Sequence, residues 1–277
     1  MSLHRPESLE DALALLERGA TVLAGGTDVF PALRDAPARG DMVDVTGIPG
    51  LRGIARIGDG WQIGAATTWT DIVRAELPPL FDGLKGAARE VGSVQIQNAG
   101  TVAGNLCNAS PAADGLPPLL ALGAEVVLHG PVGRRVLPLA EFVTGVRRTA
   151  LEPAEIVVAL HVPDGPGRGV FLKLGARRYL VISIAMVAVV VEAEAGRIRR
   201  AALAVGACSA VARRLPGLEA ALTGAAAAEV AAIVAATDLP ELAPIDDVRA
   251  SAGYRLDAAR TLLSRAILTA MEVPHVA

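Results

Sequence analysis

The sequence has 277 residues, of which 52% are hydrophobic and 20% are charged, so apolar side chains suffice for a core and a largely disordered chain is excluded. The formal net charge is −3, from 26 basic and 29 acidic residues, which excludes the basic surplus that nucleic-acid binding requires. A chain of this length can form two or three compact subdomains. We therefore expect a globular protein whose partners do not include nucleic acid.

Signals for a membrane, for secretion or for a metal are few. The longest apolar run covers residues 180–191 and is interrupted by Ser183, whereas a transmembrane helix needs about 20 residues. Residues 1–8 lack the basic-then-apolar order of a secretory signal. Cys107 and Cys208 are the two cysteines, and they form no Cys-x-x-Cys motif. We expect a cytoplasmic protein with no membrane span and no metal site, so that any iron would be carried by another chain.

The first part of the chain follows an α/β pattern. Ser8 precedes apolar residues at helical spacing and Gly19 follows them, which predicts a helix between the two. A strand at 21–24 comes next, and Gly25 and Gly26 then stand at a strand-to-helix corner. Further elements are expected as a helical turn at 29–33, a strand at 42–45, and a β-hairpin with strands at 54–57 and 61–65.

The middle of the chain is dominated by a segment at 92–115 that is rich in Gly, Asn, Ser and Pro. We expect an irregular loop there, and a loop of this length inside a compact domain is usually functional. The flanking elements are expected as helices at 70–76, 84–91 and 117–122, and strands at 125–128 and 156–162.

A turn-rich stretch at 163–169 marks the expected domain boundary. Beyond it, strands are expected at 170–174, 182–193 and 198–205, the last two as an antiparallel hairpin, and helices at 218–222, 225–236 and 246–271, with Asp246 as the cap of the last. The order of elements predicts a mixed α+β protein.

Two glycine-containing loops carry the chemistry of a phosphate cradle. Gly25 and Gly26 in Ala-Gly-Gly-Thr-Asp at 24–28, and Gly104 in Thr-Val-Ala-Gly-Asn at 101–105, allow backbone N–H groups to approach one anion. Neither loop has Lys or Arg, which favours a diphosphate held by neutral donors over a phosphoryl group that is transferred. The alternative for each loop is a plain tight turn. P-loop and Rossmann motifs are absent from the sequence.

Two charged residues are further candidates for a binding site. Asp114 can accept hydrogen bonds from sugar or ribityl hydroxyls, or it can cap the helix expected from Pro117. Lys173 lies in an expected strand, where a lone lysine is more often a solvated edge residue. Because the sequence contains no hydrolase or zinc-protease motif, no catalytic residue is assigned.

Together these motifs resemble the FAD-binding medium subunit of the molybdenum hydroxylases, which are the xanthine dehydrogenase and carbon monoxide dehydrogenase flavoproteins. The resemblance covers essentially the whole chain. It rests on Ala-Gly-Gly-Thr-Asp at 24–28, on Gln-Asn-Ala-Gly-Thr-Val-Ala-Gly-Asn at 97–105 with Asn-Ala-Ser-Pro-Ala-Ala-Asp at 108–114, on Phe-Leu-Lys-Leu-Gly-Ala-Arg-Arg at 171–178, and on Ser-Ala-Gly-Tyr-Arg at 251–255.

The resemblance implies a two-lobed FAD-binding fold of the vanillyl-alcohol oxidase and p-cresol methylhydroxylase type, followed by a C-terminal antiparallel sheet with helices. It implies FAD-binding subdomains at 1–55 and 56–165 and a C-terminal α/β domain at 170–277. The residues that it places at the FAD are Leu23, Ala24, Gly25, Gly26, Thr27, Asp28, Thr101, Gly104, Asn105, Asp114, Val157 and Lys173. It also places the loop at 177–183 near the isoalloxazine ring, where Tyr179 either covers the ring or fills a gap between the C-terminal sheet and a helix.

The function implied by the resemblance is electron transfer within a multisubunit hydroxylase. A large molybdopterin-binding subunit would oxidise the substrate, a small subunit would carry [2Fe–2S] clusters, and the FAD of this chain would reduce NAD or another acceptor. Two alternatives remain: a stand-alone FAD-dependent oxidase or dehydrogenase, and a non-catalytic nucleotide-binding interaction module.

Overall fold

The computed structural model describes residues 2–34, 36–37 and 40–271. Segments of the chain alternate between two compact units. The first unit comprises Met1–Ala75, Ser93–Ala109 and Ala124–Asp164, and the second comprises Glu76–Gly92, Ser110–Gly123 and Gly165–Ala277. The subdomain boundaries expected near residues 55 and 165 stay a prediction.

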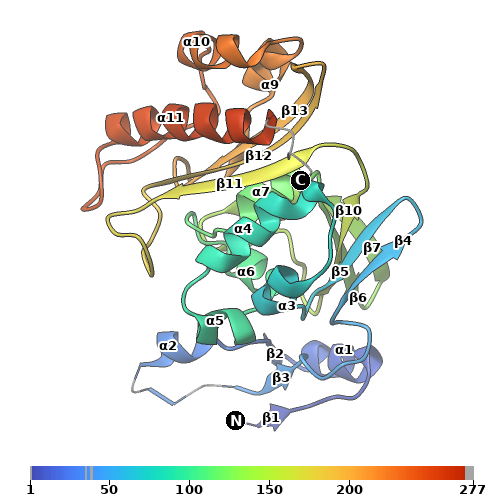
Figure 1. The fold of residues 1–277 in the computed structure, drawn as a ribbon. Coiled ribbons are helices and arrows are strands. Elements are labelled where there is room, and N and C mark those ends of the chain that lie inside the picture. Colours follow the sequence, from blue (N-terminus) through green and yellow to red (C-terminus); the bar gives the residue numbers. More distant parts are fainter. Residues whose placement is uncertain (1, 35, 38–39, 272–277) are drawn as a thin grey trace. The chain divides into compact units, whose positions relative to one another are not determined.

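A parallel three-stranded sheet begins the first unit. Its strands are β1 (Leu3–His4), β2 (Thr21–Leu23) and β3 (Met42–Asp44), with β3 in the middle (Figure 1). Helix α1 (Leu9–Glu17) starts where expected, because the Ser8 hydroxyl accepts a hydrogen bond from the Asp11 backbone N–H at 3.1 Å. Helix α2 (Val29–Leu33) follows the first glycine loop.

An antiparallel five-stranded sheet forms the larger part of the first unit. Its order is β4-β5-β10-β6-β7, so β10 (Ile156–Pro163) is central, and the hairpin of β4 (Ile54–Ile57) with β5 (Gly60–Gly64) is confirmed. Strand β6 (Glu125–Gly130) pairs with β7 (Gly133–Pro138), an edge strand that sequence reasoning missed because its side chains are largely exposed and polar.

The expectation of an irregular loop at 92–115 was wrong. Two short helices, α5 (Val94–Ala99) and α6 (Val102–Asn108), occupy most of it. Each begins after a hydroxyl residue whose side chain accepts a hydrogen bond from a first-turn N–H, Ser93 for α5 and Thr101 for α6. The remaining short elements of the first unit are α3 (Trp69–Arg74), α8 (Leu139–Phe142), β8 (Val143–Gly145) and β9 (Arg148–Thr149).

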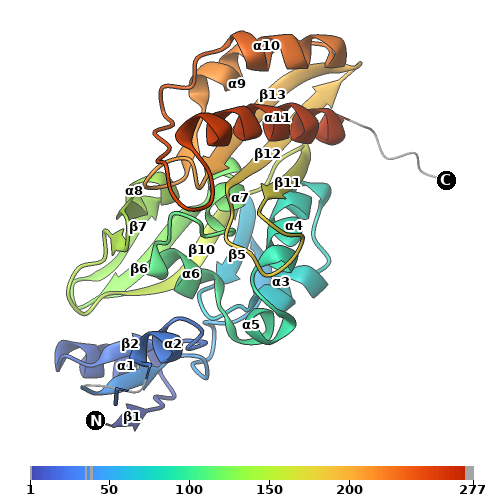
Figure 2. The ribbon, with the colours of Figure 1, turned by 90° about the vertical axis from the view of Figure 1, so that its left-hand side faces the viewer.

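The second unit is an antiparallel sheet with helices on both faces (Figures 1 and 2). Its strands in order are β11 (Arg168–Leu174), β12 (Ala185–Glu194), β13 (Arg197–Gly206) and β14 (Arg213–Arg214). Its helices are α4 (Asp82–Glu90), α7 (Leu116–Ala121), α9 (Pro216–Leu222), α10 (Val230–Ala236) and α11 (Ala252–Met271), with short 3₁₀ turns at Pro79–Phe81 and Ala227–Glu229. Strand β12 is covered on both faces, which explains its nearly continuous apolar sequence.

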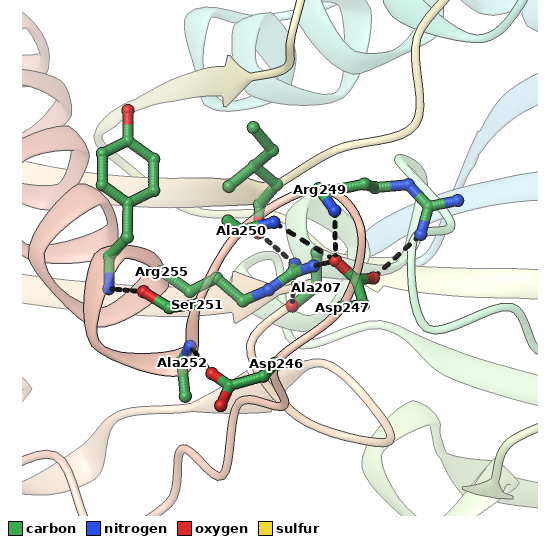
Figure 3. A network of polar contacts seen from close by, with 10 residues as sticks. Ala207, Asp246, Asp247, Arg249, Ala250, Ser251, Ala252 and Arg255 are labelled. Atoms are coloured by element: carbon green, nitrogen blue, oxygen red, sulfur yellow. Dashed lines mark hydrogen bonds and ion pairs between the residues drawn. The ribbon is translucent and has the colours of Figure 1, made fainter.

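Helix α11 starts six residues later than the sequence suggests. It begins at Ala252, whose N–H donates to the Asp246 carboxylate at 2.5 Å, so Asp246 bonds the helix end from a distance (Figure 3). The residues between them turn around Asp247. Its carboxylate accepts hydrogen bonds from the Arg249 N–H at 2.8 Å and from the guanidinium of Arg255 at 2.7 Å.

Arg255 is a buried cation at the start of α11. Only 3% of it is exposed, and its guanidinium also donates to the carbonyl group of Ile184 at 2.6 Å. It donates as well to the carbonyl group of Ala207 at 3.1 Å (Figure 3). One side chain therefore connects α11 to the residue that precedes β12 and to the residue that follows β13. The Ser-Ala-Gly-Tyr-Arg motif is structural in this unit.

Candidate functional site

The first glycine loop connects β2 to α2 and requires its glycines. Gly26 has a φ of +68°, in the left-handed region that favours glycine. A Cβ on Gly25 would lie 1.8 Å from the carbonyl oxygen of Ala99, so the loop backbone lies directly against the end of α5. The two glycines are thus needed for the turn and for the close approach of two backbone segments.

The same loop has unused backbone donors. Among residues 2–34, 36–37 and 40–271, no hydrogen-bond acceptor is found for the N–H groups of Gly25, Gly26 and Thr27. Consecutive unpaired N–H groups in a tight loop form a concave site for an anion. The loop therefore has the chemistry of a phosphate cradle.

The second glycine loop uses its backbone differently. The Thr101 hydroxyl accepts from the Gly104 N–H at 3.0 Å, and the Thr101 carbonyl accepts from the Asn105 N–H at 3.0 Å. The N–H groups of Val102 and Ala103 donate to carbonyl groups of the segment that follows β5, those of Thr67 and Ala65. What this loop leaves unpaired is a side-chain atom, because Oδ1 of Asn105 is buried and has no partner among the described residues.

A polar bridge joins the two loops at their far ends. The side-chain amide of Asn108, in the last turn of α6, donates to the carboxylate of Asp28 at 2.8 Å. Asp28 occupies the cap position of α2 but makes no capping bond with its side chain. The structure thus places the loop at 24–28 against residues on both sides of the loop at 101–105, namely Ala99 and Asn108.

Asp114 and Lys173 also meet, within the second unit. The Lys173 ammonium donates to Oδ2 of Asp114 at 2.8 Å, and the Ser183 hydroxyl donates to Oδ1 at 3.1 Å. Asp114 is 8% exposed, and this burial raises the pKa of its carboxyl while Lys173 and Ser183 oppose the rise. The three residues form a buried charged cluster, called here the Asp114 cluster.

The alternatives considered for these two residues were wrong. The cap position of α7 is held by Gly115 with no side-chain hydrogen bond, so Asp114 does not cap the helix. Lys173 does lie on an edge strand, but its side chain is only 7% exposed. Ser183 was missed from the sequence because it lies in an apolar run and meets Asp114 across 69 positions.

A pocket of about 380 Å³ adjoins Lys173 in the second unit, and it is lined by Glu90, Lys173, Leu174, Gly175, Arg177, Arg178 and Val181. Tyr179, in the loop beside this pocket, is 62% exposed, so the idea that it fills a gap against a helix was wrong. The guanidinium of Arg178 lies 5.3 Å from the centre of its ring.

The other expected site residues lie in or next to the sheets of the first unit. Val157 is buried on β10, beside an irregularity in its pairing with β6 between Val157 and Ala159. Leu23 is buried at the end of β2, and Ala24 begins the first glycine loop. Within the described ranges, no helix is long and apolar enough to span a bilayer, and no group of acidic, His or Cys side chains is arranged to hold a metal ion.

Comparison with known proteins gives the class of this site. The family described as the FAD binding domain in molybdopterin dehydrogenase matches residues 1–165. The family described as the CO dehydrogenase flavoprotein C-terminal domain matches residues 171–270. Fold and loops therefore define an FAD-binding oxidoreductase subunit.

Individual relatives agree over nearly the full length. The chain is 32% identical over 279 residues to the xanthine dehydrogenase FAD-binding subunit of Escherichia coli O157:H7, covering 98% of this chain and 96% of that protein. It is 31% identical over 275 residues to the carbon monoxide dehydrogenase medium chain of Hydrogenophaga pseudoflava, covering 95% and 94%. A solved structure of carbon monoxide dehydrogenase from that organism, which lacks the Mo-pyranopterin moiety of the molybdenum cofactor, contains a chain with a TM-score of 0.88 at 30% identity, covering 98% of this chain and 96% of that chain.

The chain belongs to the FAD-binding medium subunits of the molybdenum hydroxylases. Its mixed α+β fold is that of the carbon monoxide dehydrogenase medium chain, as the family resemblance in the sequence predicted.

Proposed function

We propose that this subunit transfers electrons from the [2Fe–2S] clusters of a small partner subunit to NAD or another acceptor, within a complex whose large subunit binds molybdopterin. The names of the relatives support this proposal, since they include medium chains and FAD-binding subunits of such dehydrogenases. The bound FAD would supply the redox chemistry, and the chain's own residues would hold it and shield it from water.

The observation that carries the proposal is the set of unpaired polar groups in the glycine loops. The three free N–H groups at 25–27 are neutral donors, which suits a diphosphate that stays bound. Oδ1 of Asn105 is buried without a partner, an arrangement that is costly unless a ligand supplies one. Both features fit a dinucleotide. We assign the diphosphate and its flanking ribityl chain to Leu23, Ala24, Gly25, Gly26, Thr27, Asp28, Thr101, Gly104 and Asn105.

The Asp114 cluster would recognise the polar part of the dinucleotide in the second unit. Asp114 has two carboxylate oxygens with four lone-pair directions, and the hydrogen bonds from Lys173 and Ser183 leave acceptor capacity for a hydroxyl. Lys173 has further donor hydrogens on its ammonium. We therefore assign Asp114 and Lys173 to FAD, and Val157 to an apolar contact with it.

The same proposal includes the organisation and location of the chain. It has FAD-binding subdomains at 1–55 and 56–165 and a C-terminal domain at 170–277. The two matched families, at 1–165 and 171–270, support the boundary near residue 170. We also propose the cytoplasmic location expected above.

Asn105→Leu tests the assignment. Leucine removes the unpaired buried oxygen, so the free energy of unfolding of the apoprotein should stay the same or rise. FAD affinity should fall about tenfold because one hydrogen-bonding side chain is lost. Chemical unfolding of the apoprotein and titration of flavin fluorescence measure the two effects. Normal affinity in the folded variant would remove Asn105 from the site.

Purification of the chain together with its partners tests the electron route against the two alternatives. Substrate-dependent reduction of the flavin that requires the iron–sulfur subunit supports the proposal. Substrate turnover by the flavin-loaded chain alone would support a stand-alone oxidase. A chain that never takes up FAD would support a non-catalytic module.

A further inference from the structure

An arginine outside the glycine loops contacts the bridge that joins them. Arg147 lies in the turn between β8 and β9, and its guanidinium donates to both the carbonyl oxygen and Oδ1 of Asn108, the former at 3.1 Å. The other end of the same side-chain amide donates to Asp28 at 2.8 Å. A cation, an amide and a carboxylate thus form a continuous chain of hydrogen bonds from this turn to the first glycine loop.

The direction of the Asn108 amide is fixed by its two neighbours. Arg147 has only donors, so it requires the amide oxygen, and an ionised Asp28 has only acceptors, so it requires the amide nitrogen. The amide therefore has one orientation that satisfies both groups. Turning it over would place its N–H donors against the donors of Arg147 and its oxygen against the carboxylate of Asp28. Asp28 is held by this amide rather than by the first turn of α2, where its side chain makes no capping bond.

The backbone around Arg147 is shaped for this contact. Arg147 has a φ of +56°, and Ala109, which ends α6, has a φ of +45°, both in the left-handed region that residues other than glycine seldom adopt. The Arg147 N–H donates to the Ala109 carbonyl at 2.9 Å. Two strained residues bonded to each other at this place indicate that the surrounding structure imposes the geometry.

We infer that Arg147 is a positioning residue for the FAD diphosphate, acting through Asn108 and Asp28 on the loop at 25–27; this inference rests on the proposed function. The loop is fixed on one side by the contact of Gly25 with Ala99 and on the other by the bridge at Asp28. With both ends fixed, its free N–H groups are held for an anion before the ligand arrives. Within the described part of the chain, the hydrogen bonds of Arg147 go to Asn108 and Ala109 and none goes to residues 25–27.

Arg147→Gly tests this inference without threatening the fold, because glycine accepts a φ of +56° and relieves the strain. The matched control is Arg148→Ala, which removes an exposed arginine from the neighbouring position. For each full-length variant we would measure the melting temperature of the apoprotein, the FAD dissociation constant by fluorescence titration, and amide hydrogen exchange of the peptide that contains residues 25–28.

We expect Arg147→Gly to keep or raise the melting temperature, to weaken FAD binding about three- to tenfold, and to speed exchange at 25–28, with Arg148→Ala unchanged in all three. Arg147→Gly combined with Asp28→Ala should bind FAD no worse than Asp28→Ala alone, because both substitutions break one chain of bonds. Asn108→Asp, which keeps a partner for Arg147 but repels Asp28, should resemble Arg147→Gly.

Wild-type affinity and exchange in Arg147→Gly, or additive effects in the double variant, would overturn the inference while leaving the proposed function intact. If the wild-type chain bound no FAD, the proposed function would fail. The exchange measurement on the apoprotein would then still decide whether Arg147 orders the loop.

Discussion

The glycine loops of the first unit and the Asp114 cluster of the second differ in the groups that each offers to a ligand. The loops offer neutral groups, the N–H groups of residues 25–27 and the side-chain oxygen of Asn105. The cluster offers a buried ion pair, Asp114 with Lys173. Neutral donors in a fixed backbone respond to shape, whereas a buried ion pair responds to charge and pH. The two regions should therefore fail for different reasons.

The largest effect is expected from a substitution that changes the shape of the first glycine loop. Gly25→Ala would place a Cβ 1.8 Å from the carbonyl oxygen of Ala99, so the two backbone segments must move apart. We expect FAD affinity to fall by roughly a hundredfold or more, since about 3 kcal/mol of pre-organised binding is enough for that. Flavin content after purification and fluorescence titration measure it.

Gly47→Ala is the matched control for Gly25→Ala, because Gly47 has nothing within 4 Å of an added Cβ and an ordinary φ. It should bind FAD like the wild type. A folded Gly25→Ala protein with normal affinity would show that the contact between the loops is irrelevant to the ligand.

The next effect concerns charge in the Asp114 cluster, and it is expected on stability rather than on FAD affinity. Lys173→Met leaves the Asp114 carboxyl buried beside Ser183 alone, and breaking a buried pair typically lowers the free energy of unfolding by about 3 kcal/mol. Without the lysine the pKa of Asp114 rises further above its ordinary value. A raised carboxyl pKa means that ionisation opposes folding, so the deficit should grow as the pH increases.

Urea unfolding of the apoprotein at pH 5 and pH 8 measures the effect of Lys173→Met. Replacing both partners, as Lys173→Met with Asp114→Asn, should recover most of the lost stability because no unpaired charge remains. If Lys173→Met lowers the free energy of unfolding by the same amount at both pH values, the loss is not caused by ionisation of Asp114.

The smallest effect is expected at Asp247, an aspartate of the second unit whose pKa is shifted in the opposite direction from that of Asp114. Hydrogen bonds from the Arg249 N–H and then from the Arg255 side chain lower its pKa from 3.8 to about 2. The ionised form therefore stabilises the fold above pH 3.8, and this contribution disappears as the pH falls from 3.8 towards 2. Asp247→Asn should lower stability at neutral pH and should converge with the wild type on the acid side.

Unfolding curves between pH 2 and pH 7 test the Asp247 prediction, with the exposed Asp238→Asn as control. Parallel curves for Asp247→Asn and the wild type would contradict it. With the Lys173 variant, this measurement separates two aspartates of one unit: burial raises the pKa of Asp114, whereas hydrogen bonds lower the pKa of Asp247.

Features with local causes were predictable from the sequence. Ser8 caps α1, the turn at 58–60 forms the hairpin, and the apolar run of β12 is buried on both sides. The glycine loops were found because their residue types determine backbone chemistry directly. By contrast, α5 and α6 were read as loop, since their composition hid the capping residues Ser93 and Thr101.

Features that depend on distant contacts were not predictable. Nothing near Ser183 or Arg147 in the sequence indicates that they meet Asp114 and Asn108. The start of α11 was misplaced because Asp247 binds Arg255, which keeps the residues before Ala252 in a turn. The two glycine loops have similar residue compositions. Only their hydrogen bonds show that the N–H groups of the first are free and that those of the second are used.

The alternation of the chain between its two units has a consequence for experiments that divide the protein. The segments Glu76–Gly92 and Ser110–Gly123 belong to the second unit, where α4 packs on β11 and α7 packs on β12 and β13. A fragment ending at residue 165 would keep both helices but lose the strands that cover them, and their apolar faces would be exposed to water. We expect such a fragment to aggregate. The smallest piece of this protein that folds should therefore include the C-terminal sheet, even when only the glycine loops are of interest.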